Sequence, residues 1–230
     1  AGADDGRGPL VLHWDGAEWT RRESGVRGDL WWVHAVPDGP VFFGGSDAHV
    51  LRYESGAFER LRTPGLRKHI VFGIWAAAPD DVYAVGSSAG RNGFIWHYDG
   101  QAFRELPLPE GLPEDAFRDV PGFFKVWGTS AEDVWIVGGK GVILQGNAAD
   151  GFSLRSSDEN TTFFTVHAAK EQLVIAGGSS SGVLLASNGD DLEDRTPPDS
   201  PLLQGACVAD DGTAWAVGVG VSIYRDGGGG

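Results

Sequence analysis

Hydrophobic residues in this chain come in short bursts that are separated by Gly, Pro, Asp and Ser. The stretch from Ser130 to Asn147, SAEDVWIVGGKGVILQGN, holds an acidic turn, an apolar run, a glycine pair and a second apolar run. Short runs rich in Val, Ile and Trp between turn residues are typical of β-strands, whereas a helix repeats its apolar positions about every 3.6 residues. The pattern therefore predicts an all-β protein with many turns.

The burst recurs along the chain. Successive copies are LWWVHAVPDGPVFFGG, VFGIWAAAPDDVYAVG, FKVWGTSAEDVWIVGG, FTVHAAKEQLVIAGG and LQGACVADDGTAWAVG, and they align on His34, Trp75, Trp127, His167 and Cys207 at intervals of 41, 52, 40 and 40 residues. The long interval contains an insertion rich in Pro and charge near Leu106 to Gly122, which we interpret as a loop. A period of about 40 residues indicates a repeat architecture.

Each repeat reads as four strands joined by turns. First strands such as WWVHAV and second strands such as VWIVG are followed by third strands such as FIWHY and fourth strands such as AFREL. The pairs Asp15-Gly16, Asp99-Gly100 and Asn188-Gly189 favour two-residue hairpins between third and fourth strands. Four antiparallel strands per repeat of this length predict the blades of a β-propeller. We expect a single propeller domain over residues 1–230, with repeats at 10–29 (partial), 30–69, 70–122, 123–161, 162–200 and 201–227.

The strand inventory bears on how a ring would close. Third strands occur six times, whereas first, second and fourth strands occur five times each. If AEWTRR (Ala17 to Arg22) supplies the outer strand of the last repeat, five four-stranded blades close by strand exchange between the termini. One third strand is then left over, so a propeller of six or seven blades, of which this chain is a fragment, stays open.

Three stretches carry a resemblance to known proteins. VWGTSAEDVWIVG, IWAAAPDDVYAVG and HWDGAEWT resemble the repeats of bacterial β-propellers, often exported or at the cell surface, with a V-W-G-x-S-x-x-D-V-W-x-V-G unit. The resemblance spans Leu10 to Gly227 and implies the propeller fold. It implies no particular activity, because propellers serve in binding, scaffolding and catalysis.

Composition narrows the classes of partner. The formal net charge is −14, with 32 Asp and Glu against 18 Lys and Arg, and such a surface repels the phosphates of nucleic acids. No apolar run reaches the about 20 residues that a transmembrane helix needs. Cys207 is the single cysteine, so the chain holds no internal disulfide, and Met is absent. An exported, periplasmic or cell-surface location fits a processed chain of this kind.

The first strands offer little for catalysis. They contain no Asp or Glu, whereas a glycosidase needs two carboxylates, and no nucleophile elbow, phosphate-binding loop or H-E-x-x-H motif is present. Alternation gives these strands one apolar face, expected to pack between blades, which carries Trp31, Val33, Ala35, Phe72, Ile74, Ala76, Phe124, Val126, Gly128, Phe164, Val166 and Ala168. The other face holds His34, His167 and Cys207 at one equivalent position. These residue types bind zinc or copper, although Trp75 and Trp127 fill the same position elsewhere, which favours packing between sheets.

Several of the scarce cations fall in the loops that join second to third strands and one repeat to the next. Long irregular loops on a rigid scaffold are where binding residues gather. The candidate ligand-binding set, which includes two neighbouring indoles, is Trp31, Trp32, Arg67, Lys68, His69, Arg91, Asn92 and Lys140.

The sequence thus predicts a non-catalytic binding module that recognises a protein or a glycan through its loops, with no cofactor. A lectin would repeat one polar and aromatic set in every blade, and these loops differ, which favours a protein partner. Two alternatives stay open: an enzyme or metal site that uses His34, His167 and Cys207 in the channel, and a structural subunit of a larger surface assembly.

Overall fold

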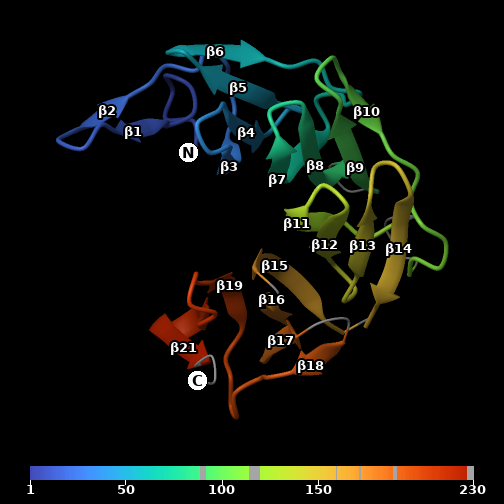
Figure 1. Ribbon diagram of the computed structural model, residues 1–230. Coiled ribbons are helices and arrows are strands. Elements are labelled where there is room, and N and C mark those ends of the chain that lie inside the picture. Colours follow the sequence, from blue (N-terminus) through green and yellow to red (C-terminus); the bar gives the residue numbers. More distant parts are fainter. Residues whose placement is uncertain (89–91, 114–119, 159, 171, 189–190, 227–230) are drawn as a thin grey trace. The chain divides into compact units, whose positions relative to one another are not determined.

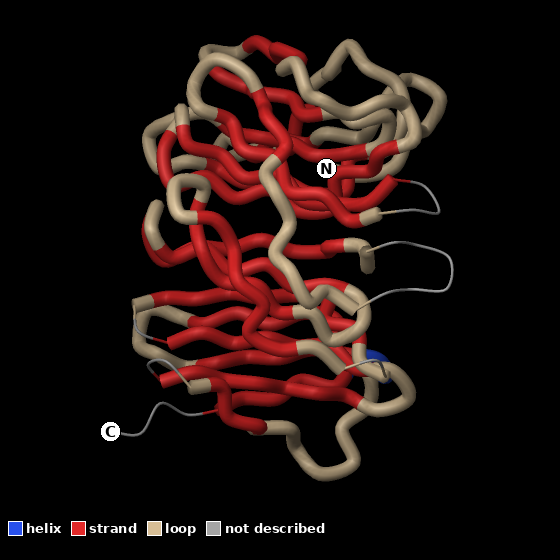
Figure 2. The backbone as a smooth tube through the Cα atoms, turned by 90° about the vertical axis from the view of Figure 1, so that its right-hand side faces the viewer, coloured by secondary structure: helices blue, strands red, loops and turns tan. Residues whose placement is uncertain are grey.

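The structure is a computed structural model that describes residues 1–88, 92–113, 120–158, 160–170, 172–188 and 191–226 (Figure 1). The chain divides into two compact units, Ala1–Pro107 and Leu108–Gly230, and each is described by itself. Nearly all regular structure is β-strand, as Figure 2 shows in red. One 3-10 helix, η1 (Val219–Val221), occurs among the described residues, and none of their helices is long and apolar enough to span a membrane.

The first unit holds a two-stranded sheet and two four-stranded sheets, each in sequential strand order. Neighbouring strands are antiparallel throughout. The strands of the three sheets are β1 (Leu12–Trp14) and β2 (Trp19–Arg21); β3 (Leu30–Ala35), β4 (Val41–Gly45), β5 (Val50–Glu54) and β6 (Ala57–Arg60); and β7 (His69–Ala78), β8 (Asp81–Ser88), β9 (Gly93–Tyr98) and β10 (Phe103–Glu105).

The second unit holds two four-stranded sheets and a three-stranded sheet, again antiparallel and in sequential order. Their strands are β11 (Phe123–Ser130), β12 (Asp133–Gly138), β13 (Ile143–Asn147) and β14 (Gly151–Ser156); β15 (Thr162–Ala169), β16 (Gln172–Gly178), β17 (Gly182–Asn188) and β18 (Leu192–Asp194); and β19 (Leu203–Val208), β20 (Ala214–Gly218) and β21 (Ser222–Asp226). The predicted four-stranded antiparallel sheets are confirmed. The number of blades and the closure by strand exchange stay predictions.

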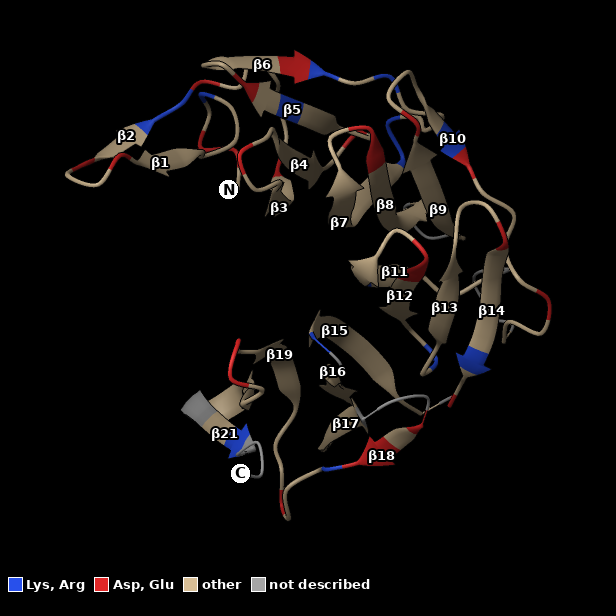
Figure 3. Ribbon diagram, viewed as in Figure 1, with Lys and Arg blue, Asp and Glu red and all other residues tan. Residues whose placement is uncertain are grey.

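Apolar side chains from consecutive sheets form the cores. In the first unit, Phe42 and Val50 of one sheet share a buried cluster with Ile74, Ala84 and Trp96 of the next. In the second unit, a cluster joins the sheet β11–β14 to the sheet β15–β18; its buried members are Trp135, Val137, Ile143, Phe163, Val166, Ala168, Leu173 and Ile175. Within each unit, apolar side chains of one sheet are therefore buried against the sheet that follows it. Figure 3 shows the charged residues mainly in turns and in fourth strands such as β10 and β18.

The hairpin turns differ from the prediction. Asp15 and Asp99 each start a four-residue loop, in which the Asp carboxylate accepts hydrogen bonds from the two amides that follow the glycine. The two-residue turn with positive φ at both positions lies instead at Ser55-Gly56, between Glu54 and Ala57. The Asp side chain caps its own loop, which replaces the backbone turn that the Asp-Gly pair suggested. Gly189 lies outside the described residues.

Every first strand contains a β-bulge at the same place. The pairing register shifts by one residue between Leu30 and Trp32, and the equivalent shift occurs in the other four first strands. The bulged residues are Trp31, Phe72, Phe124, Phe164 and Gln204. A bulge places an extra residue opposite one partner and so moves it out of the strand's alternation. The residue before the bulge, rather than the bulged residue, therefore joins the apolar face of each first strand.

Candidate functional site

The predicted loops do share one edge of each sheet, which we call the loop edge. There a residue near the start of the third strand donates a backbone hydrogen bond to a carbonyl at or just before the start of the next sheet. The three bonds are Ala48 N to His69 O (2.8 Å), Gly141 N to Thr161 O (2.7 Å) and Gly182 N to Ser200 O (2.8 Å). The loop edge is therefore tied together inside each unit rather than built of independent loops.

The turn from Leu66 to His69, at the loop edge of the first unit, is held by hydrogen bonds and ring contacts. The carbonyl of Leu66 accepts from the amide of His69 (2.9 Å), and the amide of Leu66 donates to Nδ1 of the His69 ring (3.1 Å). The His69 ring lies 5.5 Å from that of Phe94 and 5.6 Å from that of Trp96. Gly65 lies so close to the Trp96 ring that a Cβ there would overlap it. These contacts hold the turn in one position.

This turn presents an apolar residue and two cations to solvent. Leu66 is 73% exposed, more than any other large hydrophobic residue of the described chain, and Arg67 and Lys68 are both exposed. Two adjacent cations are notable in a protein of net charge −14. Preorganised apolar and cationic groups are features of binding surfaces, because little side-chain or loop ordering remains to be lost on association.

Trp31 lies at the bulge of β3 and is 54% exposed. Its ring meets that of Phe72, the bulged residue of β7, edge to face at 5.9 Å, and in the second unit the rings of Phe124 and Phe164 lie 5.9 Å apart in a tilted arrangement. We expected Trp31, Val33 and Ala35 to be buried between sheets, and this is wrong for all three. Val11 and Val26 cover Phe43 and Leu51 of this sheet, in the cluster to which Leu30 rather than Trp31 belongs.

The other predicted ligand-binding residues fall in different surroundings. Trp32 is half-buried against the cluster of Phe42 and Ile74, so it serves the core of the first unit. The backbone carbonyl of Asn92 accepts from Ser88 N (3.1 Å), and Arg91 lies outside the described residues. Lys140, half-buried in the second unit, has positive φ and a carbonyl that accepts from Asp158 N (2.9 Å).

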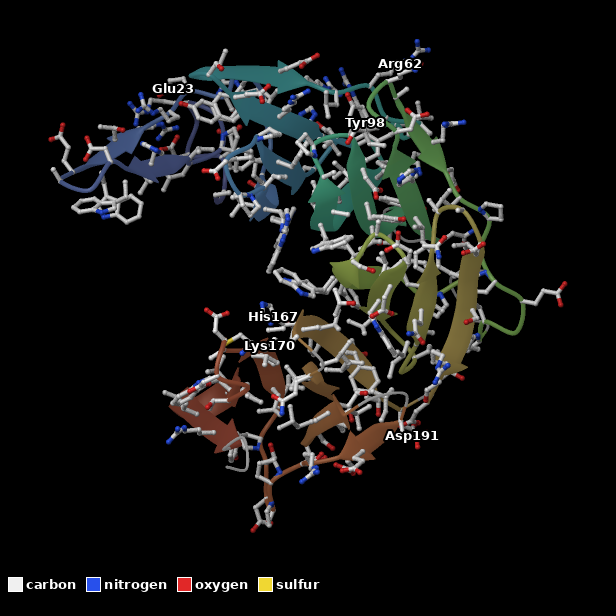
Figure 4. The ribbon with its side chains drawn as sticks, in the orientation of Figure 1. Glu23, Arg62, Tyr98, His167, Lys170 and Asp191 are labelled. Carbon is white, nitrogen blue, oxygen red and sulfur yellow. The ribbon has the colours of Figure 1, made fainter. Side chains whose placement is uncertain are left out.

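Two members of the metal alternative pack against tryptophan. The His34 ring lies 6.5 Å from Trp75, and the His167 ring lies 4.2 Å from Trp127. Nδ1 of His167, labelled in Figure 4, accepts from the amide of Val208 in the next sheet (3.1 Å). Cys207 is exposed. Within the described part of the chain, no three or more His, Cys, Asp or Glu residues are grouped to hold a metal ion, and the metal alternative stays a prediction.

Lys125 is a buried cation that the sequence reasoning did not single out. Its side chain in β11 is 4% exposed, and Nζ lies 5.5 Å from the centre of the Trp127 ring. Burial disfavours the charged ammonium and lowers the pKa of Lys125 to about 7. Burial, with a smaller effect of Lys125, also lowers the pKa of His167. A lysine inside the apolar run FFKVW was the available signal.

A shallow cavity of about 370 Å³ lies at the opposite edge of the sheet β11–β14. Asp133 accepts there from Thr129 Oγ1 (2.6 Å) and from Gln145 Nε2 (2.8 Å), while Asn147 Nδ2 donates to Asp150 (3.0 Å). The polar groups of this cavity thus bond to one another, which stabilises the hairpin ends.

No known family model matches the chain, and no curated protein matches its sequence. Solved structures do resemble it. YCF48 bound to D1 peptide superposes with a TM-score of 0.64 at 13% identity, over 86% of this chain and 63% of that one. The WD40 β-propeller domain of Doa1 gives 0.67 at 11% identity, over 97% and 72%. An ancestral GH74 enzyme gives 0.70 at 10% identity, over 92% and 32%.

At such identities the likeness concerns the fold alone. The chain has the β-propeller fold, as the repeat predicted, and it spans less than two thirds of the length of YCF48. The similar structures include peptide-bound and enzymatic proteins, so function has to be argued from this chain's own residues.

Proposed function

We propose that this protein is a non-catalytic propeller module that binds a protein partner through the loop edge of its first unit. The observation that carries the proposal is the rigid turn that exposes Leu66 between supporting contacts, with Arg67 and Lys68 beside it. The exposed Trp31, in contact with the half-buried Phe72, lies close to the start of the first strands, toward the same edge. Aromatic and arginine side chains carry much of the binding energy at protein interfaces.

Two further observations support this reading. The first strands β3, β7, β11, β15 and β19 carry no Asp or Glu that could act as acid, base or nucleophile. The loops at the loop edge differ from repeat to repeat, which suits one protein partner better than repeated sugar sites. The structure of YCF48 bound to D1 peptide is a precedent for a similar fold that binds a peptide.

The partner surface follows from the chemistry of the turn. An apolar pocket or side chain would cover Leu66, and carboxylates would pair with the two cations, because opposite charges steer association and fix orientation. We therefore propose an acidic peptide segment with an aliphatic or aromatic anchor. Export to the cell surface is part of the same proposal and rests on the repeat resemblance.

The test is selection of a displayed random-peptide library on the full chain. Enriched peptides should pair Asp or Glu with an apolar anchor, and the triple variant Leu66→Ser/Arg67→Ala/Lys68→Ala should bind them at least about tenfold more weakly. Arg195→Ala, an exposed cation of the second unit, is the matched control and should bind as the unmodified protein does. Equal binding by the triple variant, or no enrichment at all, would overturn the proposal.

A further inference from the structure

The last sheet, β19–β21, exposes a face that the other sheets bury. Trp215, Val217 and Ile223 are 38%, 45% and 63% exposed, and we call them the last-sheet face. Val217 pairs with Ile223 in the ladder, as Val137 pairs with Ile143 in the sheet β11–β14. The equivalent residues of that sheet, Trp135, Val137 and Ile143, are 4%, 0% and 0% exposed.

The chain itself shows what covers a face of this type. Trp135, Val137 and Ile143 share a buried cluster with apolar residues of the following sheet, among them Phe163, Val166 and Ile175. The last-sheet face has the same residue types in the same register, so it is built to pack against a following sheet of the same kind.

The hairpin β1–β2 exposes a face of the other type, one that in a complete sheet would pack against the preceding sheet. Leu12, Trp14 and Trp19 are 46%, 46% and 64% exposed, with the two indole rings 5.5 Å apart, and we call them the hairpin face. The segment HWDGAEW matches HYDGQAF, which places Trp14 and Trp19 at the positions of Tyr98 and Phe103. Leu12 stands at the position of Trp96.

Those equivalents lie on the side of a sheet that meets the preceding sheet. Trp96, Tyr98 and Phe103 are buried in the cluster that contains Phe42 and Val50 of the sheet before them. The hairpin face is therefore complementary in kind to the last-sheet face. A two-stranded sheet is marginally stable unless its apolar side is covered, and large exposed apolar patches mark interaction sites.

We propose that the last-sheet face of one copy of this chain packs on the hairpin face of a second copy, head to tail. Each face is exposed within its own unit, and its counterparts elsewhere in the molecule are buried against a face of the other type. Within the described residues, β21 pairs only with β20, so its outer edge is also open to a strand of the second copy. The contact is heterologous, which leaves one face of each type available for further copies.

Two charge-inserting variants test this with the full chain. Trp19→Glu disables the hairpin face and Ile223→Glu disables the last-sheet face; both side chains are exposed, so the fold is retained and far-UV circular dichroism verifies it. Light scattering after size exclusion should show concentration-dependent multiples of 24.4 kDa for the unmodified chain and a single copy for each variant. An equimolar mixture of the variants should form pairs and nothing larger, because one intact face of each type remains.

Val33→Glu is the control, an exposed apolar residue of β3 that belongs to neither face, and it should assemble as the unmodified chain does. A chain that stays a single copy at every concentration, or variants that fail to pair when mixed, would overturn the proposal. Neither result would bear on peptide binding by the Leu66 turn, which is measured separately.

Discussion

The sheets β11–β14 and β19–β21 present the same apolar residues in the same register, yet one is buried and the other exposed. Trp135 and Ile143 pack against the sheet that follows them, whereas Trp215 and Ile223 meet solvent. The difference shows that the sequence of one repeat specifies the pairing of its strands and an apolar face of its sheet. Burial, and with it stability, comes only from a neighbouring sheet.

The largest expected change in stability comes from Lys125, which is buried in the sheet β11–β14. Replacement by Met, which has a similar volume and no charge, should raise the free energy of unfolding by about 4 kcal/mol at pH 6 and below. The folded pKa of about 7 lies below the ordinary value of 10.5, so the cost of protonated Lys125 is fully present below pH 7. Between pH 7 and 10.5 the unfolded chain binds more protons, and the cost fades as pH rises.

Urea unfolding of the unmodified chain and Lys125→Met from pH 6 to pH 10 measures this effect. The two curves of stability against pH should converge toward pH 10. Curves that stay parallel would contradict a neutral, desolvated amine at high pH, and Lys170→Met, an exposed lysine, is the control expected to show no such convergence.

Truncation of the equivalent isoleucines Ile143 and Ile223 should show the next largest difference in stability. Ile143→Ala should lower the free energy of unfolding by about 3 kcal/mol, because it removes buried methylenes and leaves a cavity. Ile223→Ala, at the equivalent position of the last sheet, should change it by less than about 0.5 kcal/mol in a dilute sample. Urea denaturation at low protein concentration compares the two, and equal losses would mean that the last-sheet face is covered within one chain.

The side chains beside the two tryptophans give the smallest effect. Gln145 Nε2 donates to Asp133 at 2.8 Å near Trp135, while Arg225 lies 5.6 Å from the centre of the Trp215 ring. Gln145→Ala should cost about 1 kcal/mol and Arg225→Ala about 0.5 kcal/mol or less, since the second contact is exposed. Thermal unfolding monitored by tryptophan fluorescence ranks them, and the reverse order would show that the last sheet is more desolvated than its exposure indicates.

Much of the fold followed from the repeat. Alignment on His34, Trp75, Trp127, His167 and Cys207 located the strands and their antiparallel order, because period-2 alternation and turn residues are local signals. The bulge was missed because four of the five bulged residues, Trp31, Phe72, Phe124 and Phe164, are apolar and fit the alternation of an unbroken strand. A register shift depends on pairing with the second strand, which no single strand's pattern reveals.

The candidate site was predictable in part. Arg67, Lys68 and His69 were selected for charge and loop position, and the structure adds how their turn is held: the His69 ring and Gly65 pack against Phe94 and Trp96. Leu66 was passed over, since one leucine in a loop looks ordinary until its exposure is known. Trp32 was included as a neighbour of Trp31, but its ring packs against the core cluster of the first unit, whereas Trp31 is exposed.

The bulge shared by all five first strands separates strand pairing from the display of one side chain. In an uninterrupted strand the same residue would have to do both. The ladder on either side of it stays in register whichever residue occupies the extra position, as indole, phenyl and amide side chains all do here. Substitution at that position can therefore change the side chain that a first strand displays without disturbing the pairing of its sheet. Repeats of this kind can acquire new binding specificities one residue at a time.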